Sequence, residues 1–115
     1  MKINEIASIL NAEIITNFSD ERTDIQYGFA SDLMSDVLAY ATSDSLLITG
    51  LNNHQVIRTA EMMDMTTVLF VRGKKPGKDI IDLAVENSLT ILATDHTMFK
   101  TCGLLVLSGM KGIEG

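Results

Sequence analysis

The feature that most constrains the fold is an alternation of short apolar runs with amphipathic stretches of roughly ten residues. In the second half of the chain the runs are Leu46–Thr49, Thr67–Val71 and Thr90–Ala93. Strands that alternate with helices of this length form right-handed β-α-β crossovers, which make neighbouring strands parallel and cover the sheet with helices. The runs are apolar throughout, as strands buried on both faces are. The sequence therefore predicts an α/β fold with a small, mainly parallel β-sheet flanked by helices.

Apolar side chains at helical spacing mark the helices that accompany these strands. Two further strands are expected upstream, at Ala12–Thr16 and Ile25–Ala30, with Gly28 as a bulge or a point of close backbone approach. Each helical stripe is expected to face the sheet. The stripes are Ile3, Ile6, Ala7 and Leu10; Leu33, Met34, Val37, Leu38 and Ala41; Val56, Ile57, Ala60 and Met63; Ile80, Ile81, Ala84 and Val85; and Met98, Phe99, Cys102, Leu105 and Val106.

Length and composition exclude several classes of protein. The 115 residues show no linker and no repeat, which indicates one domain over residues 1–115. A single cysteine, Cys102, excludes an internal disulfide and favours a reducing compartment. The N-terminus lacks the apolar stretch of a secretory signal and no run is long enough to span a bilayer, so we expect a cytoplasmic protein. A net charge of −6 argues against nucleic acid or an anionic membrane as partner.

The polar turns after the strands contain the candidate site residues. In a parallel sheet, ligands bind beyond the carboxyl ends of the strands, where helix N-termini offer free N–H groups. A basic turn from Arg72 to Gly77 adds positive charge at this edge. The sequence thus predicts a site for an anionic small molecule, a nucleotide or a phosphorylated metabolite. Its candidate residues are Gly28, Ser31, Asp32, Asn53, His54, Arg72 and Lys74.

These residues also have an ordinary structural explanation. Oxygen-bearing side chains at helix starts serve as N-caps in any protein. Here the candidate caps are Ser31 and Asp32, Asn52 and Asn53, and Thr94 or Asp95. The turn that holds Arg72 and Lys74 contains the only proline and two glycines, which is typical of an exposed, solvated loop.

The sequence contains no recognisable catalytic or metal-binding constellation. His54 and His96 lack a Cys, Asp or Glu partner at ligand spacing, so no metal is expected. Cys102 stands among apolar residues without a flanking base and is expected to be a packing residue. Because no phosphate-loop motif is present either, we expect neither enzymatic activity nor a cofactor.

Three stretches of the chain are similar to one known family. Gly28–Val37 resembles the central motif of DRTGG domains, and Asn53–Ala60 and Phe70–Pro76 are similar to the same domains, so the resemblance covers nearly the whole chain. Such domains occur alone, beside CBS domains in regulated pyrophosphatases, and in phosphotransacetylases. The resemblance implies a parallel α/β core like that of MurF and of the N-terminal domain of HPr kinase/phosphorylase. It further implies a regulatory or accessory role, no catalytic residues and frequent dimers.

The signature behind the name of that family is altered in this chain. Arg22 and Thr23 are out of step with Gly28, and Tyr27 stands where a glycine is expected. Glycines let a ligand or a partner backbone approach closely. Tyr27 in place of a glycine would hinder such an approach and any function that needs it.

The last helix has more apolar residues than one face can hold. Leu104 and Leu107 fall opposite its predicted inner stripe, and Gly103 would let another backbone come close. We therefore expect Leu104 and Leu107 to form the interface of a two-fold homodimer. The alternative is that they cover the first helix or the C-terminal tail.

Two functions follow from these observations. The first is a non-enzymatic regulatory or accessory module that self-associates, binds an anionic small molecule and acts on an unidentified partner protein. The second is a protein–protein interaction or scaffold domain without a ligand. A test of binding to nucleotides and phosphorylated metabolites would separate the two.

Overall fold

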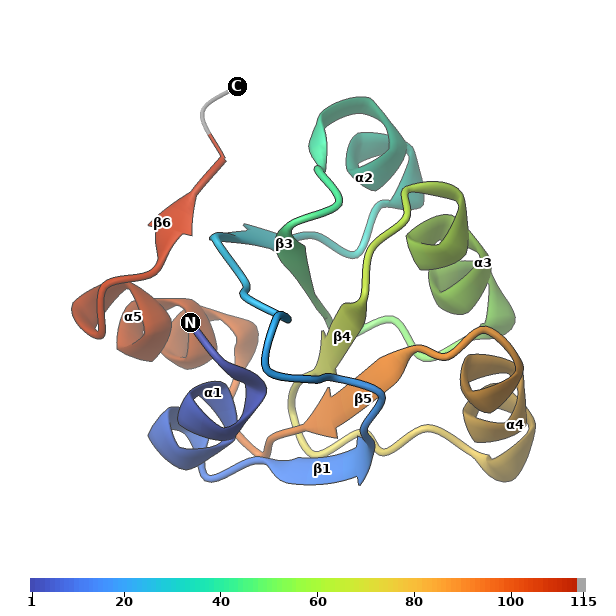
Figure 1. Cartoon of the computed structure of the whole chain (residues 1–115), viewed down its shortest axis with the longest axis horizontal. Helices are drawn as coiled ribbons and strands as arrows, with labels where there is room; N and C mark the ends of the chain where they lie inside the picture. The colour runs from blue at the N-terminus through green and yellow to red at the C-terminus, as the bar shows by residue number, and fades with distance from the viewer. Residues whose placement is uncertain (114–115) are drawn as a thin grey trace.

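The computed structural model describes residues 1–113, which form a mixed sheet with helices on both faces (Figure 1). Within this range no helix is long and apolar enough to cross a membrane. The helices are α1 (Ile3–Leu10), α2 (Met34–Tyr40), α3 (His54–Met62), α4 (Lys78–Glu86) and α5 (Met98–Leu107). The strands are β1 (Glu13–Thr16), β2 (Tyr27–Ala30), β3 (Ser45–Thr49), β4 (Thr67–Phe70), β5 (Thr90–Ala93) and β6 (Lys111–Gly112).

The strands β2 to β5 are parallel, as the sequence predicts. The order across the sheet is β1-β5-β4-β3-β2-β6, and β2, β3, β4 and β5 pair in parallel with their neighbours. The carboxyl ends of these four strands therefore lie at one edge. At the borders, β1 runs antiparallel to β5, and the short β6, which the sequence analysis did not identify, pairs with Tyr27 and Gly28 of β2. The predicted α/β fold with a mainly parallel sheet and flanking helices is confirmed.

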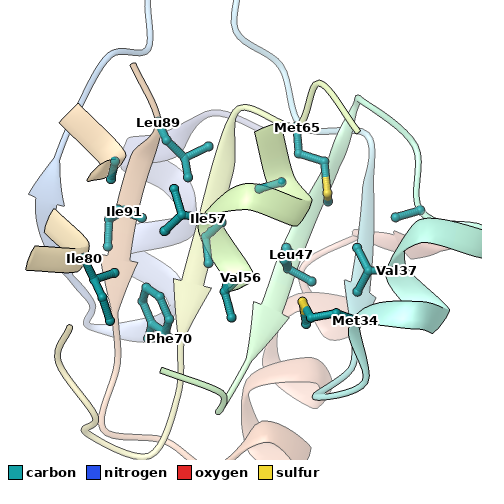
Figure 2. Packing of buried hydrophobic residues seen from close by; sticks show 14 of the residues in the cluster. Met34, Val37, Leu47, Val56, Ile57, Met65, Phe70, Ile80, Leu89 and Ile91 are labelled. Carbon is teal, nitrogen blue, oxygen red and sulfur yellow. The ribbon is translucent and has the colours of Figure 1, made fainter. Parts of the chain in front are cut away.

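The sheet separates two hydrophobic clusters. Leu47, Ile57 and Phe70 belong to the cluster under α2, α3 and α4, which Figure 2 shows from close by. Leu46 and Leu105 belong to the cluster under α1 and α5. Successive side chains of a strand point to opposite faces, so neighbours such as Leu46 and Leu47 fall into different clusters. This explains why β3, β4 and β5 are buried at every position.

The start of α5 differs from the sequence prediction. Thr97 is the N-cap, and its Oγ1 accepts a hydrogen bond from the backbone N–H of Lys100 at 3.3 Å, so the predicted caps Thr94 and Asp95 are wrong. Thr94 is buried, and its Oγ1 donates to the carbonyl oxygen of Leu10 at 2.9 Å. The hydroxyl therefore ties the end of β5 to the end of α1.

The inner face of α5 also differs from the predicted stripe. Phe99 and Val106, both expected inside, are 91% and 63% exposed. The helix instead turns Thr101 and Leu105 towards the sheet, and both are buried. The helix α5 carries apolar residues on all its sides, so the period of its apolar residues does not select the buried side. The packing of α5 against α1 and β2 decides it.

In this orientation of α5, the two predicted dimer residues differ in exposure. Leu104 is half-buried and packs against the cluster under α1 and α5, which is the alternative that the sequence left open. Leu107 is 86% exposed. Leu107 is therefore the more accessible of the predicted pair.

Smaller differences occur at the borders of other elements. Three residues of the predicted helical stripes are exposed: Leu33, which precedes α2, Leu38 in α2 and Val85 in α4. Each helix packs on the sheet along a narrower stripe than predicted. Strand β2 begins at Tyr27 rather than Ile25, although Ile25 is buried.

Thr101 has a polar atom that its surroundings do not satisfy. The residue is buried, and its Oγ1 has no hydrogen-bond partner among residues 1–113. An unpaired buried hydroxyl costs roughly 1–3 kcal/mol, and valine has nearly the same shape as threonine. We expect Thr101→Val to raise the free energy of unfolding in urea by about 1 kcal/mol.

The matched control for this substitution is Thr97→Val, which removes the N-cap of the same helix. It is expected to lower the free energy of unfolding by about 0.5–2 kcal/mol. A loss of stability in Thr101→Val would contradict the unpaired state of its hydroxyl.

Candidate functional site

Asp32 joins the ends of β2 and β3 at the carboxyl edge of the sheet. Its Oδ1 accepts hydrogen bonds from the backbone N–H of Gly50 at 2.7 Å and from Oγ1 of Thr49 at 3.0 Å. The predicted capping role is wrong, because the N-cap of α2 is Leu33, without a side-chain bond. Beside it, Oγ of Ser31 accepts from the N–H of Leu33 at 3.0 Å, a local turn ahead of the helix.

The contacts of Asp32 favour its ionised form. Burial acts to raise the pKa of this carboxyl, but the hydrogen bonds from Gly50 and Thr49 and the positive charge of Arg72 outweigh it. The pKa of Asp32 therefore lies below its usual value. At neutral pH the side chain is a carboxylate, which only accepts hydrogen bonds.

Arg72 brings a guanidinium group to the same edge. It follows β4 with a left-handed backbone, φ 64°, which is held because its N–H donates to the carbonyl oxygen of His96 at 2.7 Å. Gly73 continues the turn at φ 68°, and its N–H donates to the carbonyl oxygen of Thr94 at 2.9 Å. The side chain of Arg72 reaches back over β3, where Nη2 donates to the carbonyl oxygen of Gly50 at 3.4 Å.

Gly50 is the residue on which this arrangement depends. A Cβ atom placed on it would lie 2.4 Å from Nη2 of Arg72, so any larger residue would displace the guanidinium. The same residue donates its N–H to Asp32. The sequence analysis missed Gly50, and the signal that could have revealed it is a glycine directly after a buried strand.

The loop after β3 contributes two asparagines. Asn53 is the N-cap of α3, as predicted, and its Oδ1 accepts from the N–H of Val56 at 3.3 Å. Nδ2 of Asn52 donates to the carbonyl oxygen of Lys75 at 3.0 Å and ties this loop to the basic turn. Oδ1 of Asn52 is buried and has no hydrogen-bond partner in the part of the chain that the structure describes.

His54 and Lys74 lie at the outer side of the same edge. Nε2 of His54 is 3.2 Å from Oδ2 of Asp79, and both side chains are exposed. Lys74 is exposed and forms no ion pair with any residue from 1 to 113, whereas Lys75 pairs with Glu13 at 3.2 Å. The basic turn was predicted to be an exposed, solvated loop; Arg72 to Lys75 are exposed, but Pro76 is buried.

Gly28 is the one predicted site residue that lies apart from this edge. It is inside β2, paired with Leu46 and Gly112, and a Cβ atom on it would be 3.1 Å from Sδ of Met110. The close approach at Gly28 is therefore made by a side chain of the same subunit. The residues that the carboxyl edge does bring together are Ser31, Asp32, Asn53, His54, Arg72 and Lys74.

An apolar groove lies next to Gly28. It has a volume of about 180 Å³, with Ala30 and Ile48 on the side of the sheet and Cys102 and Val106 on the side of α5. Burial raises the pKa of the Cys102 thiol, as expected of a residue that packs rather than reacts.

The fold of this chain has counterparts among known proteins. The model of the DRTGG domain family matches residues 5–108. This chain belongs to the DRTGG domain family. The resemblance seen in the sequence is thereby confirmed. No curated protein matches this DRTGG domain.

A solved structure shares the fold of this DRTGG domain. It contains the CBS and DRTGG domains of the regulatory region of Clostridium perfringens pyrophosphatase, complexed with the activator diadenosine tetraphosphate. The two structures superpose with a TM-score of 0.71 at 19% sequence identity, over 93% of this chain. The DRTGG domain described here spans 46% of the length of that chain. At this identity the similarity establishes the fold.

Proposed function

We propose that this DRTGG domain is a non-enzymatic regulatory or accessory module that self-associates and binds an anionic small molecule at the carboxyl edge of its sheet. Acting as one domain of residues 1–115, it would report the ligand to a partner protein in the cytoplasm. The proposal depends on one observation: Asp32, Gly50 and Arg72 link the ends of three adjacent strands into one polar group. A ligand that contacts this group can change how the three loops are held.

The charges at the edge suit a phosphate. Arg72 and Lys74 supply two positive charges at this edge, where the carboxylates of Asp32 and of Asp95, next to Gly73, offset part of them. Phosphate oxygens accept charge-assisted hydrogen bonds from guanidinium and ammonium groups. We therefore expect Lys74 and Arg72 to contact the phosphate of the ligand.

Two acceptors at the edge favour a nucleotide over bare phosphate. The carboxylate of Asp32 accepts hydrogen bonds, and Oδ1 of Asn52 is a buried acceptor with an unfilled bond in the described residues. Ribose hydroxyls and base amino groups supply such donors, and inorganic phosphate does not. Because the Clostridium perfringens regulatory region binds diadenosine tetraphosphate as its activator, that compound is the first probe.

The test is a thermal shift assay followed by calorimetric titration with diadenosine tetraphosphate, ATP and inorganic phosphate. A ligand that binds only the folded state raises the melting temperature by mass action. We expect the nucleotides to raise it more than phosphate does. Arg72→Ala and Lys74→Ala should each weaken nucleotide binding about tenfold, which corresponds to about 1.4 kcal/mol.

The control variant is Lys111→Ala, which removes an exposed lysine that pairs with Tyr27 at the opposite, amino-end edge of the sheet. It should bind as the wild type does. If no nucleotide or phosphorylated metabolite shifts the melting temperature, the ligand-binding proposal is wrong. A scaffold domain without a ligand then becomes the better interpretation.

A further inference from the structure

The outer side of α5 is an apolar stripe that no other part of residues 1–113 covers. We call Phe99, Gly103, Val106 and Leu107 the α5 stripe; residues at this spacing share one side of a helix. Phe99 is 91% exposed, Leu107 86% and Val106 63%. The only charged residue of α5 is Lys100, so none of the 15 acidic residues of the chain lies on this helix. Figure 1 shows α5 at the border of the molecule, beside β6.

Gly103 at the middle of the stripe has no packing role among residues 1–113 that requires a glycine. A Cβ atom placed on it would meet nothing within 4 Å, so no internal contact requires a glycine there. Glycine inside a helix is less stable than alanine, because it loses more backbone freedom on folding. A close approach from outside the subunit would explain a glycine at this position.

Apolar surface continues from the α5 stripe onto the sheet. Val106 belongs to the stripe and also lines the groove of about 180 Å³ between α5 and β2. The opposite wall of that groove is formed by Ala30 and Ile48. A partner that covers Val106 therefore lies beside the wall of the groove.

We propose that the α5 stripe is the surface through which two copies of this chain associate, about a two-fold axis that passes near Gly103. This inference rests on the proposed self-association and replaces the predicted interface of Leu104 and Leu107. Phe99 and Leu107 are each one helical turn from Gly103, on opposite sides. Antiparallel packing about Gly103 therefore sets Phe99 against the partner's Leu107, and the same contact repeats by symmetry.

The area of the α5 stripe can be compared with that of known interfaces between two protein copies. A buried aromatic side chain covers roughly 150–250 Å², so the three large residues of the stripe together cover on the order of 400 Å² per copy. Two copies bury on the order of 800 Å² through the stripe, and the groove on each copy adds to the roughly 1,200 Å² at which specific interfaces begin. The area therefore lies at the small end of specific interfaces.

Sedimentation velocity of the full chain tests the surface. We expect the wild type to be dimeric at tens of micromolar and the double variant Phe99→Glu, Leu107→Glu to be monomeric, with the dissociation constant raised about a hundredfold or more. Because both side chains are exposed, the fold should survive, and an unchanged circular dichroism spectrum checks this. The matched control is the double variant Met62→Glu, Val85→Glu, which places the same two charges on exposed side chains of α3 and α4, 65% and 49% exposed, and should remain dimeric.

Disulfide cross-linking tests the position of the axis. In the double variant Cys102→Ser, Gly103→Cys the new thiol is the only one, and the two copies of it face each other across the proposed axis. Diamide should convert this variant into a covalent dimer. The control Cys102→Ser, Val85→Cys carries its thiol on α4 and should not cross-link.

These experiments distinguish a failure of the proposed interface from a failure of self-association and from a failure of nucleotide binding. A wild type that is monomeric at tens of micromolar overturns both the self-association and this interface. A dimeric wild type whose Phe99→Glu, Leu107→Glu variant is also dimeric overturns the interface and leaves self-association standing. Nucleotide binding at the carboxyl edge, measured on the monomeric variant, is decided independently of either result.

Discussion

Leu105→Ala is expected to lower the free energy of unfolding by about 2–5 kcal/mol, whereas Phe99→Ala on the same helix should change it by less than about 0.5 kcal/mol. Leu105 is fully buried between α5 and the sheet, and its truncation leaves a cavity in the cluster under α1 and α5. Phe99 is exposed, so its truncation removes no internal packing. Urea unfolding followed by circular dichroism measures both changes.

The comparison discriminates between two orientations of α5. In the orientation predicted from periodicity, Phe99 is inside, and its truncation would cost about 3–5 kcal/mol. A larger loss for Phe99→Ala than for Leu105→Ala would therefore contradict the observed orientation. The measurement is made at submicromolar protein, because association stabilises a folded dimer and makes apparent stability depend on concentration.

Asp32→Ala is expected to lower the free energy of unfolding by about 1–3 kcal/mol. The substitution leaves the backbone N–H of Gly50 and the hydroxyl of Thr49 without their acceptor, and both residues are buried. Asp36→Ala is the matched control, because Asp36 is an exposed carboxylate on α2. It should change stability by no more than about 0.5 kcal/mol. Equal effects of the two substitutions would mean that the bonds of Asp32 contribute nothing.

The same carboxylate predicts a pH dependence. The folded state lowers the pKa of Asp32 below the ordinary value of 3.8, so near that pH the unfolded chain binds more protons than the folded chain. Stability from Asp32 is therefore fully present above the unfolded pKa and is lost as the pH falls through the folded pKa. The difference in unfolding free energy between wild type and Asp32→Asn should be constant above about pH 5 and shrink below about pH 4. A difference that grows on acidification would reverse the predicted sign. Because Asp32 is exposed, solvent screening keeps the effect small.

The positions of the central elements could be predicted because the required signals are local. Strands β3, β4 and β5 are short runs of apolar residues, and the polar turns that follow them contain the candidate residues of the carboxyl edge. Asn53 was recognisable as a cap because an N-cap needs only its own helix. Strand β6 has two residues and no pattern of its own, so it exists only through its pairing with β2.

The candidate site was predictable in outline and not in its contacts. Parallel strands place their following turns at one edge, and this placed Asp32, Arg72 and Lys74 together. The bonds that connect these turns depend on distances between segments that are far apart in the chain. Asp32 was expected to cap α2, but the N–H of Gly50 and the hydroxyl of Thr49 lie within its reach. Nothing in the residues next to Asp32 indicates that preference.

By itself, the sequence determined the class of fold, the parallel direction of the inner strands and the group of turns that share one edge. The alternation of short apolar runs with amphipathic stretches is enough for these features, because it specifies which segments must be buried. Only the tertiary structure decided which side of α5 faces the sheet, what Asp32 bonds and which leucine of the last helix is left exposed. Burial of a residue on an apolar helix depends on the shape of what packs against it, and that shape comes from other parts of the chain.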